Sequence, residues 1–209
     1  MVRSLTRLVS GTTAGSGPVN WSFLVWWVLA GLVSYTIGFP LGLALGRSLL
    51  WGWVAGGGLV ALLQWVLLRH QITRAGWWIV VSVVGMTIGT GLSLVVSQYV
   101  LQLAGLTAAF ASVGAAVGIS VGTAQWLMLR LRFRRSGWWV LASTAGYSLG
   151  LLAAVNAPVA IPVRQALIFG PEFGGLVGVI SSAVTGITMF WLLRRPVSTN
   201  EGTLGSNSG

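Results

Sequence analysis

The sequence contains no cysteine, no lysine and no aspartate, and it has one histidine and two acidic residues, both of them glutamate. The absence of cysteine excludes disulfides, thiolate metal sites and cysteine nucleophiles. Because no acidic residue lies in an apolar run and the histidine stands alone, the chain lacks the groups for acid–base catalysis, for a metal site and for a carboxylate relay. We therefore expect a protein that is not an enzyme and that holds no cofactor or metal.

Charge is also scarce, since only 7% of the residues are charged while 55% are hydrophobic and the mean hydropathy is +0.86. A soluble domain of this length carries about a quarter charged residues, so most of this chain is expected to face lipid. The net charge of +10 comes from twelve basic residues, all arginine. They stand at the ends of apolar runs, which favours a role in membrane topology over binding of nucleic acid.

Long apolar runs dominate what is present, and each is long enough to cross a bilayer as a helix. The sequence thus predicts an all-α membrane protein whose six transmembrane helices form three pseudo-repeated helical hairpins. A cytoplasmic segment 1–20 precedes the transmembrane domain 21–195, and a disordered cytoplasmic tail, 196–209, follows it. Pro40 is expected to kink or end the first helix. The predicted helices are 21–45, 49–68, 76–102, 108–131, 137–156 and 174–193.

Two copies of one motif connect consecutive helices. Gln64 opens Gln-Trp-Val-Leu-Leu-Arg and Gln125 opens Gln-Trp-Leu-Met-Leu-Arg, and each copy leads through an arginine-bearing turn to Gly-Trp-Trp, at 76–78 and 137–139. Small residues precede both glutamines at helical spacing, which is typical of close helix packing in membranes. When the second helices of the three predicted hairpins are aligned, the residues at equivalent positions are Gly57/Ala61/Gln64, Gly118/Gly122/Gln125 and Ser182/Gly186/Met189.

This Gln-Trp-Leu-x-Leu-Arg…Gly-Trp-Trp connection resembles that of a group of uncharacterised bacterial multi-pass membrane proteins, common in phototrophic bacteria, which repeat similar segments. The resemblance covers residues 57–150, with a weaker third copy at 174–195 that has Met189 in place of glutamine and lacks Gly-Trp-Trp. It implies a repeated helical hairpin and no activity.

The arginines predict an orientation, because short loops rich in arginine stay on the cytoplasmic side. Only Arg47 and Arg164 fall on the predicted outer side, so both termini are expected in the cytoplasm of a bacterial inner or thylakoid-type membrane. The arginines of the predicted inner side are Arg3, Arg7, Arg69, Arg74, Arg130, Arg132, Arg134, Arg135, Arg194 and Arg195.

Three sets of residues are candidate sites. Gln64 and Gln125 share a helix face with small residues, so they either bond another helix or line a pathway, and we favour bonding. Arg164 and Glu172 lie in the outer connection 158–173, which is either a plain loop or an interfacial helix with the two paired. The third set is a cytoplasmic rim that contacts anionic lipid or an acidic partner: Arg69, Arg74, Arg130, Arg132, Arg134, Arg135, Trp77, Trp78, Trp138 and Trp139.

The sequence therefore favours a non-enzymatic integral membrane protein, a packing, assembly or lipid- or pigment-associating subunit. The alternative is a small transporter or channel for a neutral or anionic solute, since transporters often contain internal repeats around their binding site. The expected partners are membrane lipid, including anionic lipid, and a protein partner or a second copy of the chain.

Overall fold

The computed structural model describes residues 20–72, 75–157 and 171–194, and within them every element of regular secondary structure is a helix. The five helices are α1 (Trp21–Gly46), α2 (Leu49–Leu68), α3 (Trp77–Leu129), α4 (Trp138–Asn156) and α5 (Pro171–Leu193). All five are long and apolar enough to cross a membrane. The all-α prediction is confirmed, and the helices are compatible with a multi-pass membrane protein.

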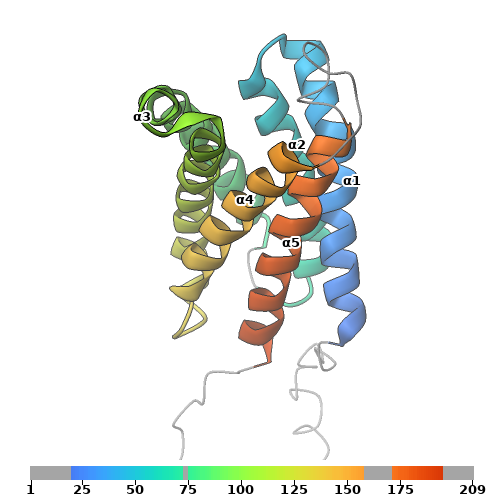
Figure 1. The fold of residues 1–209 in the computed structure, drawn as a ribbon. Coiled ribbons are helices and arrows are strands. Elements are labelled where there is room, and N and C mark those ends of the chain that lie inside the picture. Colours follow the sequence, from blue (N-terminus) through green and yellow to red (C-terminus); the bar gives the residue numbers. More distant parts are fainter. Residues whose placement is uncertain (1–19, 73–74, 158–170, 195–209) are drawn as a thin grey trace, which may run out of the picture.

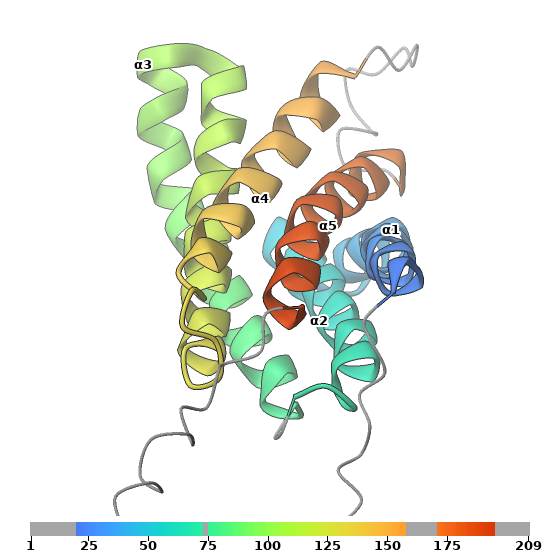
Figure 2. The same ribbon diagram turned by 90° about the horizontal axis from the view of Figure 1, so that it is seen from below.

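The expected count of six helices differs from the structure, because α3 replaces two of them. Its 53 residues would extend about 80 Å if straight, far beyond the roughly 30 Å of a bilayer core. At Gly105 the backbone leaves helical geometry, with φ 81° and ψ −177°, a conformation open almost only to glycine. The helix reverses there without an intervening loop, and Figure 2 shows its two arms side by side.

Two other boundaries differ from expectation. Pro40 does not end α1, which continues to Gly46; the turn instead forms at Arg47, whose φ of 50° and ψ of 26° are left-handed. The last helix begins at Pro171 rather than at 174, since proline suits the first turn of a helix, where its missing N–H has no partner to lose. Glu172 therefore lies in the first turn of α5 and outside the connecting segment.

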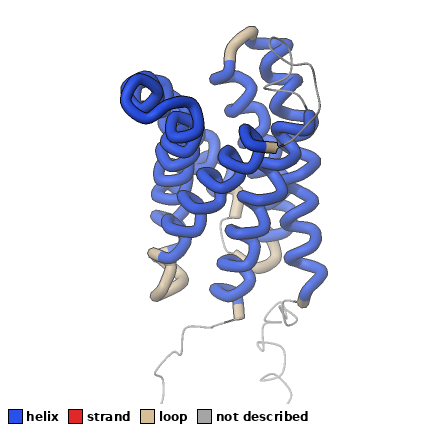
Figure 3. The backbone as a smooth tube through the Cα atoms, in the orientation of Figure 1, coloured by secondary structure: helices blue, strands red, loops and turns tan. Residues whose placement is uncertain are grey.

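The helices form a closed ring in which α1 packs on α2 and α5, α4 packs on α5 and α3, and α2 packs on α3. Figure 1 shows α1 beginning and α5 ending at the same end of the bundle. The loops that follow α2 and α3 lie at that end too, whereas the α1–α2 turn lies at the opposite end (Figure 3). Each helix thus presents one face to the centre of the ring.

Glycines allow the helices to approach closely. A Cβ added at Gly38 would lie 2.9 Å from Gly56 Cα, and one added at Gly89 would lie 2.7 Å from Val117 Cα. At Gly150 the same test places the atom 3.1 Å from Val177 Cα. Real Cβ atoms essentially never approach within 3.0 Å, so the contacts at Gly38 and Gly89 require a residue without a side chain, and the contact at Gly150 is tight.

The core consists of two layers along the bundle. One, nearer the loops after α2 and α3, contains Trp27, Trp78, Trp139, Leu68, Leu129 and Met189. The other contains Tyr35, Phe39, Met86, Tyr147, Leu151 and Val177. Large apolar side chains also cover the outside of the bundle, among them Val84, Ile88 and Leu92 of α3, each about half exposed. An apolar exterior of this kind suits a lipid environment rather than water.

Candidate functional site

Three tryptophans meet at the centre of the bundle. The ring centroids of Trp27 and Trp78 are 6.3 Å apart, those of Trp27 and Trp139 are 6.2 Å apart, and those of Trp78 and Trp139 are 5.7 Å apart. All three pairs meet edge to face, the arrangement that aromatic quadrupoles favour. Each ring is at most 1% exposed. We call Trp27, Trp78 and Trp139 the tryptophan cluster; it packs in one core layer with Leu68, Leu129 and Met189.

Each indole of the tryptophan cluster donates a hydrogen bond to a buried side chain on another helix or arm. Trp78 donates to Oε1 of Gln64 at 3.1 Å, and Trp139 donates to Oε1 of Gln125 at 2.8 Å. Trp27 donates to Oγ1 of Thr185 at 3.3 Å. A buried N–H without an acceptor would cost about 1–3 kcal/mol. The two glutamines therefore accept hydrogen bonds from the indole N–H groups of Trp78 and Trp139, which would otherwise be buried without a partner.

The two glutamines are not equivalent in their bonding. Gln125 also donates from Nε2 to Oγ of Ser82 at 2.7 Å, and Ser82 donates to the backbone oxygen of Trp78 at 2.6 Å. A chain of hydrogen bonds thus connects the second arm of α3 with its first arm and with α4. Within the described part of the chain, Gln64 has a single side-chain bond of this kind, to Trp78.

The comparison of Met189 with the glutamines is wrong by one helical turn. Thr185, four residues earlier, accepts the indole hydrogen bond, while Met189 is fully buried in the apolar core beside Leu68 and Leu129. In that comparison Gln64, Gln125 and Met189 each stand five positions before the arginine that follows the helix. The last helix extends one turn further before Arg194, so the arginine is a poor guide to depth there.

A pair of tyrosines closes the centre on the other side. The hydroxyls of Tyr35 on α1 and Tyr147 on α4 are 2.9 Å apart, and the two rings meet edge to face. Between the tryptophan cluster and this pair lies a cavity of about 20 Å³, lined by Gln64, Ser82, Gln125, Ser143 and Thr185 among others. Such a volume has room for about one water molecule. The cavity is thus small, has both polar and apolar walls, and is lined by the rings of Trp139, Tyr35 and Tyr147.

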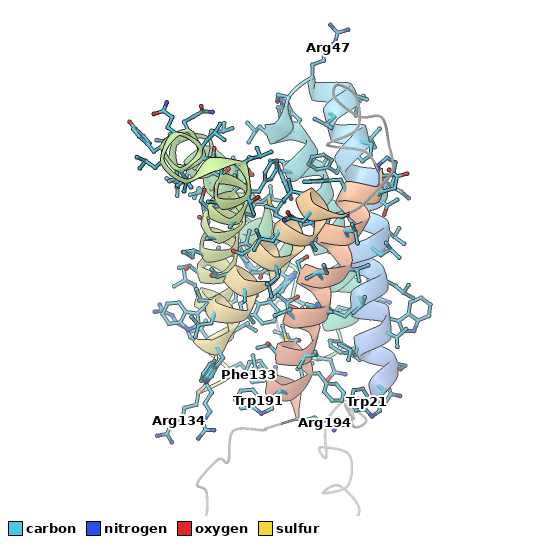
Figure 4. The ribbon with its side chains drawn as sticks, viewed as in Figure 1. Trp21, Arg47, Phe133, Arg134, Trp191 and Arg194 are labelled. Atoms are coloured by element: carbon cyan, nitrogen blue, oxygen red, sulfur yellow. The ribbon has the colours of Figure 1, made fainter. Side chains whose placement is uncertain are left out.

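The arginine rim lies at one end of the bundle. Arg69, Arg130, Arg132, Arg134 and Arg135 are all exposed, and Figure 4 shows Arg134 and Arg194 at the end opposite Arg47. The guanidinium carbon of Arg130 lies 5.3 Å from the ring centroid of Trp126, a cation–π contact. The arginines between α2 and α3 and between α3 and α4 that the structure describes are thus exposed at this end, whereas Arg74 and Arg164 lie outside the described residues.

The assignment of Trp78 and Trp139 to the rim is wrong. Trp77 and Trp138 are 60% exposed, as expected for rim residues, but their neighbours Trp78 and Trp139 are buried in the tryptophan cluster. Successive residues point about 100° apart around a helix, and here one tryptophan of each pair faces outward while the other faces the centre of the bundle. Trp26 and Trp27 divide in the same way, with Trp26 60% exposed and Trp27 fully buried.

Sequence reasoning missed several central residues. Trp27, Tyr35 and Tyr147 were not singled out, nor were Ser82 and Thr185. The repeated Trp-Trp pair at one helical depth in three helices was the available signal, because its two rings point in different directions around each helix. Thr185 had no such signal, since serine and threonine are frequent throughout α5.

The two glutamines lead to a first prediction. Gln125→Leu should lower the free energy of unfolding by about 1–2 kcal/mol, because it removes two hydrogen bonds and strands the Trp139 indole; Gln64→Leu should cost about half as much. Unfolding by a denaturing detergent in mixed micelles measures both. Equal losses, or a larger loss for Gln64→Leu, would contradict the bonding pattern described above.

Among the described residues, no three His, Cys, Asp or Glu side chains gather closely enough to hold a metal ion. Comparison with protein-family models, with curated proteins and with solved structures finds no match for this chain. The interpretation of the site therefore rests on its own geometry.

Proposed function

We propose that this chain is a non-enzymatic integral membrane protein that acts as a closed packing or assembly subunit and associates with lipid. The observation that carries the proposal is the filled centre of the bundle. The tryptophan cluster and the Tyr35–Tyr147 pair close the axis at two levels, and the cavity between them is only about 20 Å³. A bundle that fills its own axis offers its outer surface to other molecules.

The proposal includes six membrane crossings in three hairpins, since α3 is long enough for two crossings and reverses at Gly105. Three observations support a repeat: the pairs Trp26–Trp27, Trp77–Trp78 and Trp138–Trp139, the acceptors Gln64, Gln125 and Thr185, and the close glycine contacts. In this proposal Thr185 takes the place of Met189 in the third hairpin. Small residues let the helices pack where lipid supplies no hydrophobic drive.

Orientation and partners are part of the same proposal. The exposed arginines between α2 and α3 and between α3 and α4 share one end of the bundle with Trp77 and Trp138, as expected for a cytoplasmic face with aromatic anchors. Each basic residue near an anionic membrane surface contributes about 1 kcal/mol to attraction. We place this end on the cytoplasmic side of a bacterial inner or thylakoid-type membrane, in contact with anionic lipid. We propose that the outward-facing sides of the helices contact a protein partner or a second copy of the chain.

The second candidate, a transporter or channel for a neutral or anionic solute, is favoured by one observation. The small cavity is polar and lies between helices from all three proposed hairpins, the place where repeat-built transporters bind their substrate. For transport, the tryptophan cluster and the tyrosine pair would have to separate in turn.

Solute flux distinguishes the two candidates and gives a second prediction. In proteoliposomes, glycerol, urea and nitrate should cross no faster than in protein-free vesicles, because no solute larger than water fits the centre. Light scattering after an osmotic step measures the first two, and an anion electrode measures the third. Flux above the protein-free rate that disappears in Gln125→Leu would establish a pathway and overturn the packing function. Mass spectrometry of lipids and proteins that co-purify in mild detergent then tests the assembly role.

A further inference from the structure

A second, larger cavity lies away from the centre, in the half of the bundle that contains Gly105. It is a cleft of about 200 Å³ between the two arms of α3 and Trp53 of α2. We call it the α2–α3 cleft. Several of its wall residues, including Leu94, Leu101 and Leu106, are 43–56% exposed, so the cleft opens on the lipid-facing surface. Its full lining is Trp53, Thr90, Ser93, Leu94, Ser97, Gln98, Leu101, Leu106, Ala109, Phe110 and Val113.

Trp53 stands beside the cleft at a depth where two other helices carry glycine. On the second arm of α3, Gly114 packs against Ser148 of α4, where an added Cβ would lie 2.5 Å from Ser148 Cα. On α5, Gly174 packs in a similar way against the backbone of Tyr35. At the matching depth of α2 stands Trp53, whose ring packs on Tyr35 and Phe39 instead. Because an indole replaces a glycine, α2 and α3 cannot close on each other there.

One residue of the lining, Thr90, has a buried hydroxyl that forms no hydrogen bond within the part of the chain that the structure describes. Thr90 is 2% exposed. The neighbouring Ser93, also buried, donates to the backbone oxygen of Thr90 at 2.8 Å. Burying a hydroxyl without a partner costs about 1–3 kcal/mol. A ligand oxygen in the cleft would remove that cost.

We propose that the α2–α3 cleft binds a neutral, lipid-soluble molecule with an oxygen-bearing six-membered ring, whose oxygen bonds Thr90 and whose apolar tail lies in the bilayer. Among the residues that the structure describes, no charged side chain lines the cleft, so these walls would not compensate a phosphate or carboxylate head for its lost hydration. A cavity of about 150 Å³ accepts benzene, and this one is slightly larger. Trp53 and Phe110 supply aromatic walls for the ring. The inference rests on the proposed location in a membrane and adds a ligand to the lipid-associating role.

Three amphiphiles with the same tail test the proposal on the full chain in detergent micelles: decylubiquinone, decylbenzene and decyl phosphate. The amount bound per protein is measured by equilibrium gel filtration. Decylubiquinone should bind with saturation at one per chain and at least about tenfold more tightly than the other two. Equal binding of decylubiquinone and decylbenzene would show a slot for acyl chains only, and would overturn the proposal.

Variants locate the site. Thr90→Val keeps the shape of the side chain and removes its hydroxyl, and it should weaken decylubiquinone binding about three- to tenfold, the effect of one hydrogen bond. The matched control is Thr87→Val, one turn earlier on the exposed side of α3, where the hydroxyl bonds its own helix; it should bind as the unchanged protein does. Ser97→Phe should fill the cleft and abolish binding. A thermal midpoint measured for each variant confirms folding.

The outcomes separate this inference from the proposed function. If Thr90→Val and Ser97→Phe bind decylubiquinone as tightly as the unchanged protein, the cleft is not the binding site. The proposed packing function is then tested by the flux measurement alone. If solute flux is found while Thr90→Val weakens binding, the packing function is wrong and the ligand site remains.

Discussion

Replacing Trp139 with alanine is expected to lower the free energy of unfolding by about 3–5 kcal/mol, the range for a buried large aromatic residue. Trp138→Ala, one residue earlier, is expected to change it by less than about 1 kcal/mol. The two substitutions delete the same side chain from the same first turn of α4. The two side chains differ only in the direction in which they point, since Trp139 is 1% exposed and Trp138 is 60% exposed.

The large loss has three physical sources. Trp139 contacts both other rings of the tryptophan cluster, with centroids 6.2 Å from Trp27 and 5.7 Å from Trp78. Its removal leaves a cavity at the centre of the ring of helices, which the surrounding backbone cannot fill completely. It also takes the indole donor away from Oε1 of Gln125, and a buried acceptor without a partner costs further free energy.

The measurement is unfolding in mixed micelles, followed by circular dichroism and by loss of the monodisperse peak in gel filtration. Trp139→Phe is a useful third variant, because it keeps a ring and loses the N–H. It should fall between the alanine variant and the unchanged protein. Similar losses for Trp138→Ala and Trp139→Ala would mean that both rings face lipid, and the tryptophan cluster would be refuted.

The same comparison shows which parts of the fold can be derived from sequence. Helix positions followed from apolar length alone, since each span must be apolar throughout to lie in lipid. The rotation of each helix about its own axis could not be derived from the sequence, because a span that is apolar on every side carries no amphipathic pattern. Trp77 and Trp78 are equally apolar, so their opposite exposures became evident only from the packing of the helices.

Depth along the bundle was also hard to predict. The turn between the two arms of α3 was expected near Gly105, but its form, a helix that reverses at one glycine, depends on a single backbone conformation. For α5 the terminal arginine gave a register one turn away from that of the hydrogen-bonding residues. Arginine side chains are long and reach the interface from more than one depth, so they define helix ends only loosely.

The α2–α3 cleft illustrates a third limit. In the proposed repeat, Trp53 stands where the other two hairpins have Gly114 and Gly174, which is visible in the sequence once the proposed hairpins are aligned. Its consequence is visible only in three dimensions, because the indole turns toward Tyr35 and Phe39 and leaves space beside Thr90. Cavities result from imperfect packing between elements, and a one-dimensional pattern does not record such imperfections.

Close helix contact leads to the last prediction, which concerns Gly118. Gly118→Leu should destabilise the bundle by about 3 kcal/mol or more and prevent the second arm of α3 from packing on α4. A Cβ at this position would lie 2.5 Å from Thr144 Cα and 2.6 Å from the backbone oxygen of Ser143. Both atoms belong to the backbone, so rotation of a side chain cannot relieve the clash and the two helices must separate.

Gly91→Leu is the matched control, because Gly91 also lies inside α3 but faces outward with no atom within 4 Å of an added Cβ. Leucine favours a helix over glycine by up to about 1 kcal/mol, so this variant should be unchanged or slightly more stable. Thermal stability in detergent and the yield of monodisperse protein measure both. A stable Gly118→Leu protein would contradict the close contact between α3 and α4. Loss of stability in Gly91→Leu as well would contradict the outward position of Gly91, since the residues that the structure describes place nothing there.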